Sequence, residues 1–173
     1  ALKEAIARIV TDSKLPGEPK EPEGSHLVQI YDAFATPAQR EAFRAHIALA
    51  KDLDLPLQIH DRDAHAACVE VLKADGAPDR TVFHCFSGGP QLAAACAEHG
   101  WFMSFAGNST FPASTDLREA YCAAPSELLL AETDAPFLTP APYRGRPNAP
   151  YLIPVTLRFL AAERGMDADE LGA

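Results

Sequence analysis

Short apolar segments alternate with helical patterns along most of this chain, and that alternation limits the folds it can adopt. Five such segments recur about every 20 to 30 residues, and each is followed by a stretch with helical spacing. The segments read HLVQIY (26–31), PLQIH (56–60), TVFHCF (81–86), WFMSF (101–105) and ELLLAE (127–132). The sequence therefore predicts five units of one strand and one helix each.

Turn and capping residues mark where several of the helices begin. Thr36 is suited to cap a helix whose first residue is Pro37, because the first turn of a helix does not need the missing N–H of proline. The buried face of this helix is predicted to consist of Phe43, Ile47, Ala50 and Leu53. Further helices are predicted from about Ala64 to Ala74, near Pro90, from about Thr115 and from about Pro154.

The predicted strands are apolar at most positions, which is typical of a parallel sheet with both faces covered. Two α/β architectures repeat such units, the open doubly wound sheet and the closed eight-stranded barrel. A dinucleotide-binding doubly wound domain would carry G-x-G-x-x-G after its first strand, and this chain has no such motif. We therefore predict the α/β class with (βα) units of a TIM barrel. Because five strands cannot close a barrel of eight, the barrel is incomplete.

Composition limits the partners and the environment that we expect. With 173 residues, 47% of them hydrophobic, the chain is long enough to bury a substantial core. We expect residues 1–173 to form a single partial barrel domain, with an exposed loop at 13–25 where prolines, glycines and charges gather. A net charge of −9 argues against a protein that coats nucleic acid with a broad basic surface.

The cysteines and the apolar runs indicate a compartment. Cysteines 68, 85, 96 and 122 form no C-x-x-C pair, so we expect reduced thiols that fill the core. No apolar run reaches the ~18 residues that a membrane span needs, and no leader sequence opens the chain. We expect a cytoplasmic protein without a membrane partner. The chain starts without Met, inside the helix-like ALKEAIARIV, so we also expect that its beginning is missing.

Chemically active side chains stand where three of the predicted strands end. His60 ends the strand at 56–60, His84 lies near the end of the strand at 81–86, and Glu132 and Asp134 end the last one. Functional groups of both α/β architectures gather at the carboxyl ends of the strands, where the loops reach a common site. The sequence therefore predicts that these side chains converge.

Two imidazoles and a carboxylate suit a divalent ion such as zinc or manganese. Such an ion lowers the pKa of a bound water molecule to ~7, and Asp134 could orient that water or take its proton. We interpret His60, His84 and Asp134 as metal ligands, with Asp134 also the catalytic group and Glu132 a supporting acid. The alternative for either histidine taken alone is a hydrogen-bonded structural residue.

Arginines in the loops around this predicted site suit phosphate. Arg144 and Arg146, in YRGRPNAP, have the planar donor groups that pair with two phosphate oxygens at once. Arg62, in HDRDA, could hold an anion in the same way. The alternative is that these are solvated loop charges. We interpret Arg144 and Arg62 as phosphate-binding residues.

These motifs resemble those of the TatD family of metal-dependent deoxyribonucleases, which are amidohydrolase-like TIM barrels. The matching stretches are LPLQIHDRDA (55–64), TVFHCFSG (81–88) and LLLAETDAPFLTPAPYRGRPNAP (128–150), in the family's order and at its spacing. The resemblance implies that His60 and His84 bind metal, and that Asp134 binds metal and takes part in catalysis. It further implies a cofactor of divalent ions, Mg²⁺, Mn²⁺ or Zn²⁺, with two ions in many members. It also implies a DNA substrate, and single-stranded DNA is one form that we expect.

The chain also departs from the family pattern. It contains no H-x-H pair, which the family carries on its first strand, and the segment after 26–31 lacks the family's G-E-x-G-L-D with its metal-bridging glutamate. It stops at DELGA, before the last helix of the family. What remains corresponds to about strands four to eight of the barrel. Either these residues belong to a longer protein or this is a degenerate relative; the intact His60, His84, Asp134 and Arg144 favour the first.

Three functions remain open from the sequence. The leading hypothesis is a phosphodiesterase that cleaves DNA through a metal-activated water molecule. An amidohydrolase that acts on a small amide or lactone would use the same barrel and metal, and only the arginines argue against it. The third is a non-catalytic remnant. Whichever holds, we expect the 173 residues alone to be inactive or poorly active, because the bridging carboxylate and two imidazoles are missing.

Overall fold

A parallel four-stranded sheet organises the described part of the chain. The computed structural model describes residues 37–171. The strands lie in the order β1-β2-β3-β4, and each neighbouring pair is parallel. They are β1 (Leu57–His60), β2 (Thr81–His84), β3 (Phe102–Phe105) and β4 (Leu129–Ala131). The prediction of an α/β fold with a parallel sheet is confirmed. The strand predicted at 26–31, the loop predicted at 13–25 and the cap predicted at Thr36 lie outside the described residues.

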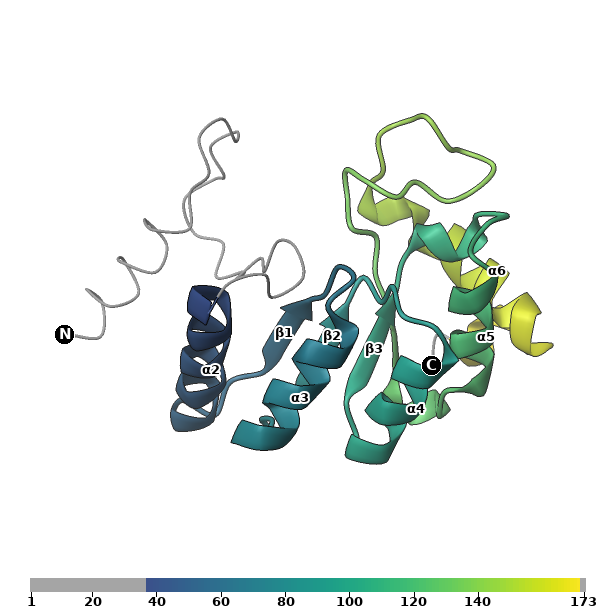
Figure 1. The fold of residues 1–173 in the computed structure, drawn as a ribbon. Helices are drawn as coiled ribbons and strands as arrows, with labels where there is room; N and C mark the ends of the chain where they lie inside the picture. The colour runs from purple at the N-terminus through teal and green to yellow at the C-terminus, as the bar shows by residue number, and fades with distance from the viewer. Residues whose placement is uncertain (1–36, 172–173) are drawn as a thin grey trace.

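A helix precedes β1 and a helix follows each strand. Figure 1 shows α2, α3 and α4 along one face of the sheet, with α5 and α6 at the β4 end. Short 3-10 turns, η1 (Gly107–Thr110), η2 (Ser126–Leu128) and η3 (Pro150–Leu152), lie in the connections. The helices are α2 (Pro37–Asp52), α3 (His65–Asp75), α4 (Pro90–His99), α5 (Thr115–Ala123), α6 (Ile153–Arg164) and α7 (Ala168–Leu171). Between residues 37 and 171, no helix is both long and apolar enough to cross a membrane.

The two faces of the sheet differ in burial within the part of the chain that the structure describes. On the helix side, Ile59, Phe83 and Met103 are buried at 0–1% exposure. On the other side Gln58 and Leu130 are exposed. Successive residues of a strand point to opposite faces, and the described helices cover only one of them. The apolar character of these strands therefore did not reveal which face the helices cover.

An aromatic layer lies on the covered face, beneath the strands that end at the predicted site. The rings of Phe86 and Phe105 are 5.3 Å apart between centroids, and those of Phe105 and Tyr121 are 5.1 Å apart. Phe83 lies 6.5 Å from Phe86 and 5.9 Å from Trp101. Such offset and edge contacts stabilise beyond simple burial, so the layer holds β2 and β3 firmly against α4 and α5.

Two burial predictions are wrong, each for a local reason. Leu53 is 53% exposed, because α2 ends at Asp52 and its periodicity does not continue into the turn. Cys122 is exposed on α5, whereas Cys68 and Cys96 fill the core as predicted and Cys85 is half-buried. All four cysteines are free thiols, as expected.

Arg164 fastens α6 to the end of α5. Its guanidinium donates hydrogen bonds to the carbonyls of Tyr121 and Ala124 and to Ser126 Oγ, and its Cζ lies 4.6 Å from the Tyr121 ring centroid. Carbonyls at the end of a helix have no partner within the helix, so an arginine from a neighbouring helix satisfies them. The C-terminal end of α6 is therefore held against the end of α5.

The start of α3 carries a pH-dependent contact. Asp61 is 7% exposed, and its carboxylate accepts hydrogen bonds from the Ala64 N–H (2.9 Å) and from His65 Nδ1 (2.6 Å). The hydrogen bond to Asp61 raises the pKa of His65, although burial acts in the opposite direction. Folding therefore favours the protonated imidazole. The resulting stability is fully present below the ordinary histidine pKa of about 6.5, and it is lost as pH rises through the higher folded pKa.

We expect His65→Gln to lower the free energy of unfolding by about 1 kcal/mol at pH 6, and by less at pH 8.5. Urea denaturation of the metal-free protein at both values measures the difference. In an Asp61→Asn background the pH dependence of the His65→Gln effect should disappear. An effect that is equal at both pH values, or that grows with pH, would contradict the assignment.

Candidate metal centre

The carboxyl ends of the strands bring the predicted residues to one edge of the sheet. His60 is the last residue of β1 and His84 the last of β2, and the two are directly paired in the strand register. Glu132 follows β4, and its N–H donates to the Phe105 carbonyl (3.0 Å), which extends the pairing with β3 by one residue. In Figure 1 the arrowheads of the strands point towards the long loop between β4 and α6. The structure therefore brings His60, His84 and Glu132 to this edge of the sheet.

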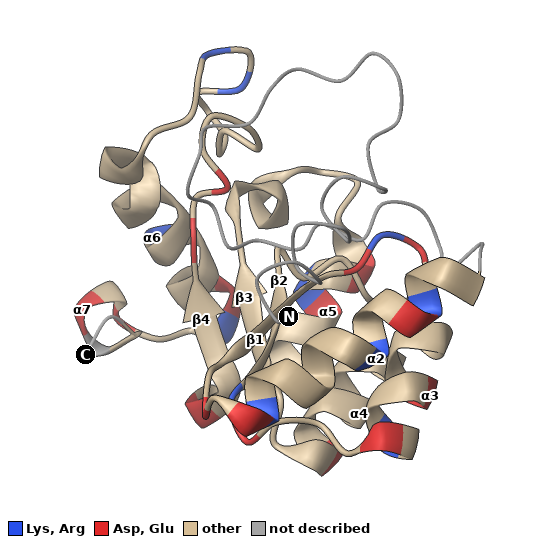
Figure 2. Cartoon of the chain, turned by 90° about the vertical axis from the view of Figure 1, so that its left-hand side faces the viewer, with Lys and Arg blue, Asp and Glu red and all other residues tan. Residues whose placement is uncertain are grey.

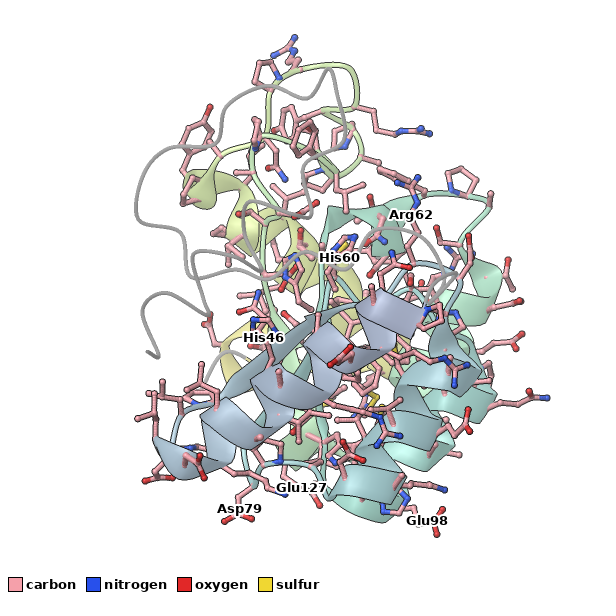
Figure 3. All side chains as sticks on the ribbon, turned by 60° about the vertical axis from the view of Figure 1, so that its left-hand side comes forward. His46, His60, Arg62, Asp79, Glu98 and Glu127 are labelled. Atoms are coloured by element: carbon pink, nitrogen blue, oxygen red, sulfur yellow. The ribbon has the colours of Figure 1, made fainter. Side chains whose placement is uncertain are left out.

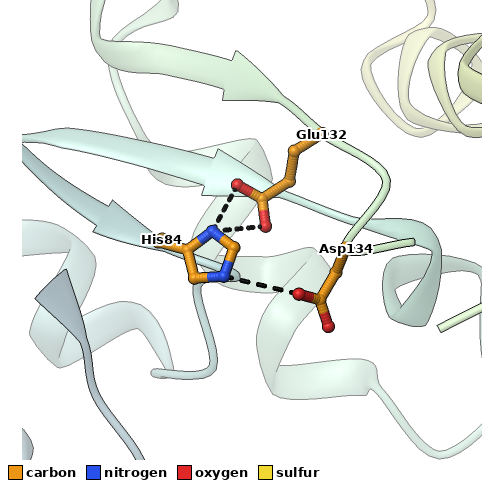
Figure 4. Close-up of side chains that lie close together, drawn as sticks. All are labelled: His84, Glu132 and Asp134. Atoms are coloured by element: carbon orange, nitrogen blue, oxygen red, sulfur yellow. Dashed lines mark hydrogen bonds and ion pairs between the residues drawn. The ribbon is translucent and has the colours of Figure 1, made fainter. Parts of the chain in front are cut away.

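His84 lies between two carboxylates. Its Nδ1 is 2.9 Å from Glu132 Oε2 and 2.9 Å from Glu132 Oε1, and its Nε2 is 3.4 Å from Asp134 Oδ1 (Figure 4). One ligand atom from each of these three residues can be chosen such that all lie within 4.8 Å of one another. Their side chains are 17%, 19% and 27% exposed, so the group is screened from solvent but open to a ligand.

Ser104 was missed by the sequence analysis and completes the group. It is 4% exposed on β3, and its hydroxyl donates a hydrogen bond of 2.5 Å to Glu132 Oε2. The segment WFMSF ends without an imidazole or a carboxylate, so the pattern of strand ends did not point to it. The available signal was a lone hydroxyl in an apolar strand, at a position that alternates with buried Met103 and Phe105. A buried hydroxyl needs a partner, and a carboxylate from the neighbouring strand provides one.

The backbone is strained beside two of the three residues. Asp134 has φ +54° and Cys85, next to His84, has φ +46°. Residues other than glycine adopt this left-handed region at a cost of about 1 to 3 kcal/mol, although aspartate tolerates it better than most. Such strain gathers where surrounding contacts fix a functional geometry. Here it turns the chain sharply at the ends of β2 and β4.

The two carboxylates determine the charge of His84. Hydrogen bonding to Asp134, and then to Glu132, raises the pKa of His84 to about 9, although burial acts in the opposite direction. The imidazole is therefore protonated at neutral pH when no metal is bound. Metal ions bind the neutral imidazole, so an ion that enters this group has to displace that proton.

His60 lies beside this group. Its ring centroid is 5.8 Å from that of His84, and its side chain does not belong to the group defined by the three close ligand atoms. Burial lowers the pKa of His60, and the charge of His84 acts in the same direction. A neutral imidazole next to two carboxylates is consistent with the predicted role of a ligand. Glu132 was predicted only to support the site. In the structure its carboxylate lies 2.9 Å from His84 Nδ1 and belongs to the group of three close ligand atoms.

The arginines surround the group without joining it. Arg62 is exposed and lies near His60, whose pKa its charge helps to lower; Figure 3 shows both at the same end of the sheet. Arg144 and Arg146 are exposed in the long loop after β4, whose tip is blue in Figure 2. The Cζ atom of Arg144 lies 4.1 Å from the centroid of the Phe111 ring. Phosphate binding by Arg144 and Arg62 remains a prediction.

Asn148, also missed from the sequence, holds this loop in shape. It is 6% exposed, and its Nδ2 donates to the carbonyls of Thr133 (2.6 Å) and Phe137 (2.7 Å). Its backbone N–H donates to the Pro136 carbonyl (3.0 Å). One buried side chain therefore ties the segment around Asp134 to the far end of the loop. An asparagine after proline in a proline-rich loop was the only sequence signal for this role.

The donor set of the group fits a divalent cation. One imidazole and two carboxylates are ligands that zinc, manganese and magnesium accept in proteins. Glu132 Oε1 is buried, and its ion pair with His84 Nδ1 (2.9 Å) is the contact given for it, without a hydrogen bond of good geometry. A cation would satisfy that oxygen and compensate the two negative charges. His84, Glu132 and Asp134 are therefore the residues that would hold a metal ion, with His60 alongside.

Comparison with known proteins agrees with this geometry. A family model described as TatD related DNase matches residues 28–173. A Mycobacterium tuberculosis protein named uncharacterized metal-dependent hydrolase TatD is 49% identical over 131 residues, which cover 75% of this chain and 50% of that protein. A protein of Escherichia coli K12 named 3'-5' ssDNA/RNA exonuclease TatD is 37% identical over 148 residues, covering 81% of this chain and 56% of that protein.

A solved structure extends the likeness to three dimensions. The crystal structure of YJJV, a TatD homologue from Escherichia coli K12, superimposes with a TM-score of 0.72 at 32% sequence identity. The match covers 77% of this chain and 51% of that chain. The parallel α/β fold thus matches the TIM-barrel-like structures of these proteins. The chain spans about half the length of the curated relatives that it matches.

Proposed function

Because the chain belongs to the TatD-related DNase family, we propose that the complete protein is a metal-dependent hydrolase that cleaves phosphodiester bonds of DNA. The observation that carries the proposal is the position of His84 between Glu132 and Asp134 at the carboxyl edge of the sheet. Membership of the family alone would not assign the reaction to these residues. The three ligand atoms lie within 4.8 Å of one another, which is close enough for one cation to contact all three, and this supports the proposal.

The residues of the group divide the work by their positions. Asp134 has the more exposed of the two carboxylates, so it is the one that would orient a water molecule and accept its proton. Ser104 fixes the orientation of Glu132, whose carboxylate in turn orients the His84 ring. A bound divalent ion would lower the pKa of that water and neutralise phosphate charge. We propose Mg²⁺, Mn²⁺ or Zn²⁺, and two ions in the complete protein.

The phosphate preference is supported by the loops. Arg144, Arg146 and Arg62 bring three positive charges to this end of a chain whose net charge is −9. Guanidinium groups pair with two phosphate oxygens at once, and an amide or lactone substrate offers no such partner. The relative named as a ssDNA/RNA exonuclease supports a nucleic acid substrate. We propose single-stranded DNA, with Arg144 and Arg62 as the phosphate-binding residues.

Metal removal tests the proposal. We expect the full-length protein that contains this chain to release nucleotides from a single-stranded DNA oligonucleotide with Mg²⁺, Mn²⁺ or Zn²⁺. Release should stop on dialysis against EDTA and return on readdition of metal, because the water is not acidic enough without it. Elemental analysis of the purified protein gives a second readout that does not depend on activity.

Three outcomes would overturn it. Release that continues at the same rate in EDTA would exclude a metal-dependent reaction. Hydrolysis of small amides or lactones with no release of nucleotides would identify an amidohydrolase instead. A protein that binds no metal when one equivalent is supplied, and that cleaves neither DNA nor small amides and lactones, would be a non-catalytic remnant.

A further inference from the structure

The loop after β4 forms a hollow that the metal centre does not use. Its volume is about 290 Å³, and its walls include Phe111, Phe137, Thr139, Arg144 and Arg146. Pro136, which also lines this hollow, is two residues from Asp134 along the chain. The loop hollow and the group that contains Asp134 are therefore built from the same loop.

The walls combine flat apolar surfaces with positive charge. Phe137 is 68% exposed, which is high for a phenylalanine, and the guanidinium of Arg144 lies over the ring of Phe111 at 4.1 Å. Arg146 adds a second positive charge, and none of the residues that line the hollow is acidic. An exposed aromatic ring and a guanidinium that lies over a second ring give the hollow flat surfaces on which a planar, electron-rich ligand can stack.

The hollow is built before any ligand arrives. Asn148 Nδ2 holds the Phe137 carbonyl (2.7 Å), and Thr139 Oγ1 donates to the Arg146 carbonyl (2.5 Å) across the loop. The Ala141 N–H donates to Thr110 Oγ1 (2.8 Å), which fastens the loop to η1. A rigid wall loses little conformational entropy on binding, so the ring of Phe137 can contribute its contact area to affinity.

A single nucleobase fits these features better than other ligands. Proteins that bind single strands stack successive bases on aromatic rings and arginine planes, and they follow the backbone with positive charge. At about 290 Å³ the hollow lies at the lower limit of small-molecule sites, which suits one flat base and not a larger group. A paired base has its faces covered by its neighbours in the duplex, so only an unpaired base can enter.

We propose that the loop hollow is a stacking subsite that takes one unpaired base of the strand whose phosphodiester lies at the His84, Glu132 and Asp134 group. This inference rests on the proposed function. It accounts for a preference for single strands, because a paired base could not enter the hollow. The wall of the hollow begins two residues from Asp134 along the chain, so the same strand would contact both sites. Phe137 and the stacked pair of Phe111 and Arg144 form its faces.

Binding of labelled DNA to the full-length protein tests the subsite. The probe is a single-stranded thymidine oligonucleotide with one 2-aminopurine, in EDTA so that no metal-dependent cleavage occurs. We expect Phe137→Ala to raise the Kd about tenfold and to abolish the 2-aminopurine quenching that wild type shows. Phe137→Tyr should keep both. Tyr151→Ala is the matched control, because Tyr151 is 77% exposed and does not line the hollow, and it should bind as wild type does.

The outcomes separate this inference from the function on which it rests. Cleavage by wild type with an unchanged KM in Phe137→Ala would overturn the subsite and leave the function standing. DNA binding that depends on Phe137, with no cleavage in the presence of any of the three metals, would support the subsite and overturn the proposed function. A blunt duplex that binds as well as the single strand, and loses as much affinity in Phe137→Ala, would exclude entry of an unpaired base.

Discussion

Asp134→Asn is expected to lower kcat for single-stranded DNA by about 10³-fold, while the Kd for DNA and the melting temperature stay close to wild type. The amide cannot accept a proton, and it carries no negative charge for a cation or for His84. Asparagine has the same size and tolerates the left-handed backbone of this position, φ +54°, as well as aspartate does. The substitution therefore removes the chemistry and keeps the fold.

Asp54→Asn is the matched control. Asp54 has a similar backbone, φ +49°, its side chain is 97% exposed, and its ion pair is with Arg80 just before β2. It lies before β1, at the opposite end of the strand from His60. We expect this variant to keep kcat within threefold of wild type. If Asp134→Asn retained more than a tenth of the wild-type rate, or if both variants lost activity equally, the catalytic assignment would fail.

The sequence predicted the part of the site that follows from strand ends. His84 ends β2 and Asp134 follows shortly after β4, and parallel strands end at one edge, so their proximity needed no side-chain detail. Ser104 and Asn148 could not be found in this way. Ser104 acts through a partner on the neighbouring strand, and Asn148 through carbonyls 11 and 15 residues away. Contacts of that kind depend on the register and on the loop path, which local patterns do not encode.

The burial of side chains was likewise predicted in part from local sequence patterns and missed in part. The periodicity of α2 identified Phe43 and Ile47, which are buried at 2% and 1% exposure, but it was continued one turn too far, to Leu53. A period describes a helix only as far as the helix extends. Asp54, with φ +49°, ends α2 in a capping turn, in which Asp54 N–H donates to the Lys51 carbonyl and Leu55 N–H to the Ala50 carbonyl; no glycine marked this end in the sequence. The exposed Leu130 and Gln58 have a different cause. Apolar strands indicate that a sheet has neighbours, but not which described elements supply them.

The loop after β4 links the metal centre to the loop hollow. Asp134 lies at its start, Phe137 and Arg144 lie in its middle, and Asn148 ties the two ends together. A change in the path of this loop would therefore affect the catalytic carboxylate and the proposed subsite together. The close approach of this loop to η1 at Gly107 is the place to test that dependence.

Gly107→Ala is expected to lower kcat/KM by about 10²-fold and to destabilise the protein by about 1 to 3 kcal/mol. A Cβ atom on Gly107 would lie 2.1 Å from the Leu138 carbonyl oxygen and 2.9 Å from Pro140 N. Both are backbone atoms, so no side-chain rotation can relieve the overlap, and the loop itself must move. Small displacements of a catalytic group are costly, because the reacting atoms must meet within a few tenths of an ångström.

Gly89→Ala separates this effect from a general cost of replacing glycine. A Cβ atom there would lie 3.7 Å from Asp116 Cβ, an ordinary contact, and the backbone is extended. We expect that variant to lose less than about 1 kcal/mol and to keep its activity within threefold. Because the loop displacement should weaken DNA binding as well as catalysis, Gly107→Ala should raise KM and lower kcat together. A variant with wild-type kcat and KM would show that the position of the loop does not control the site.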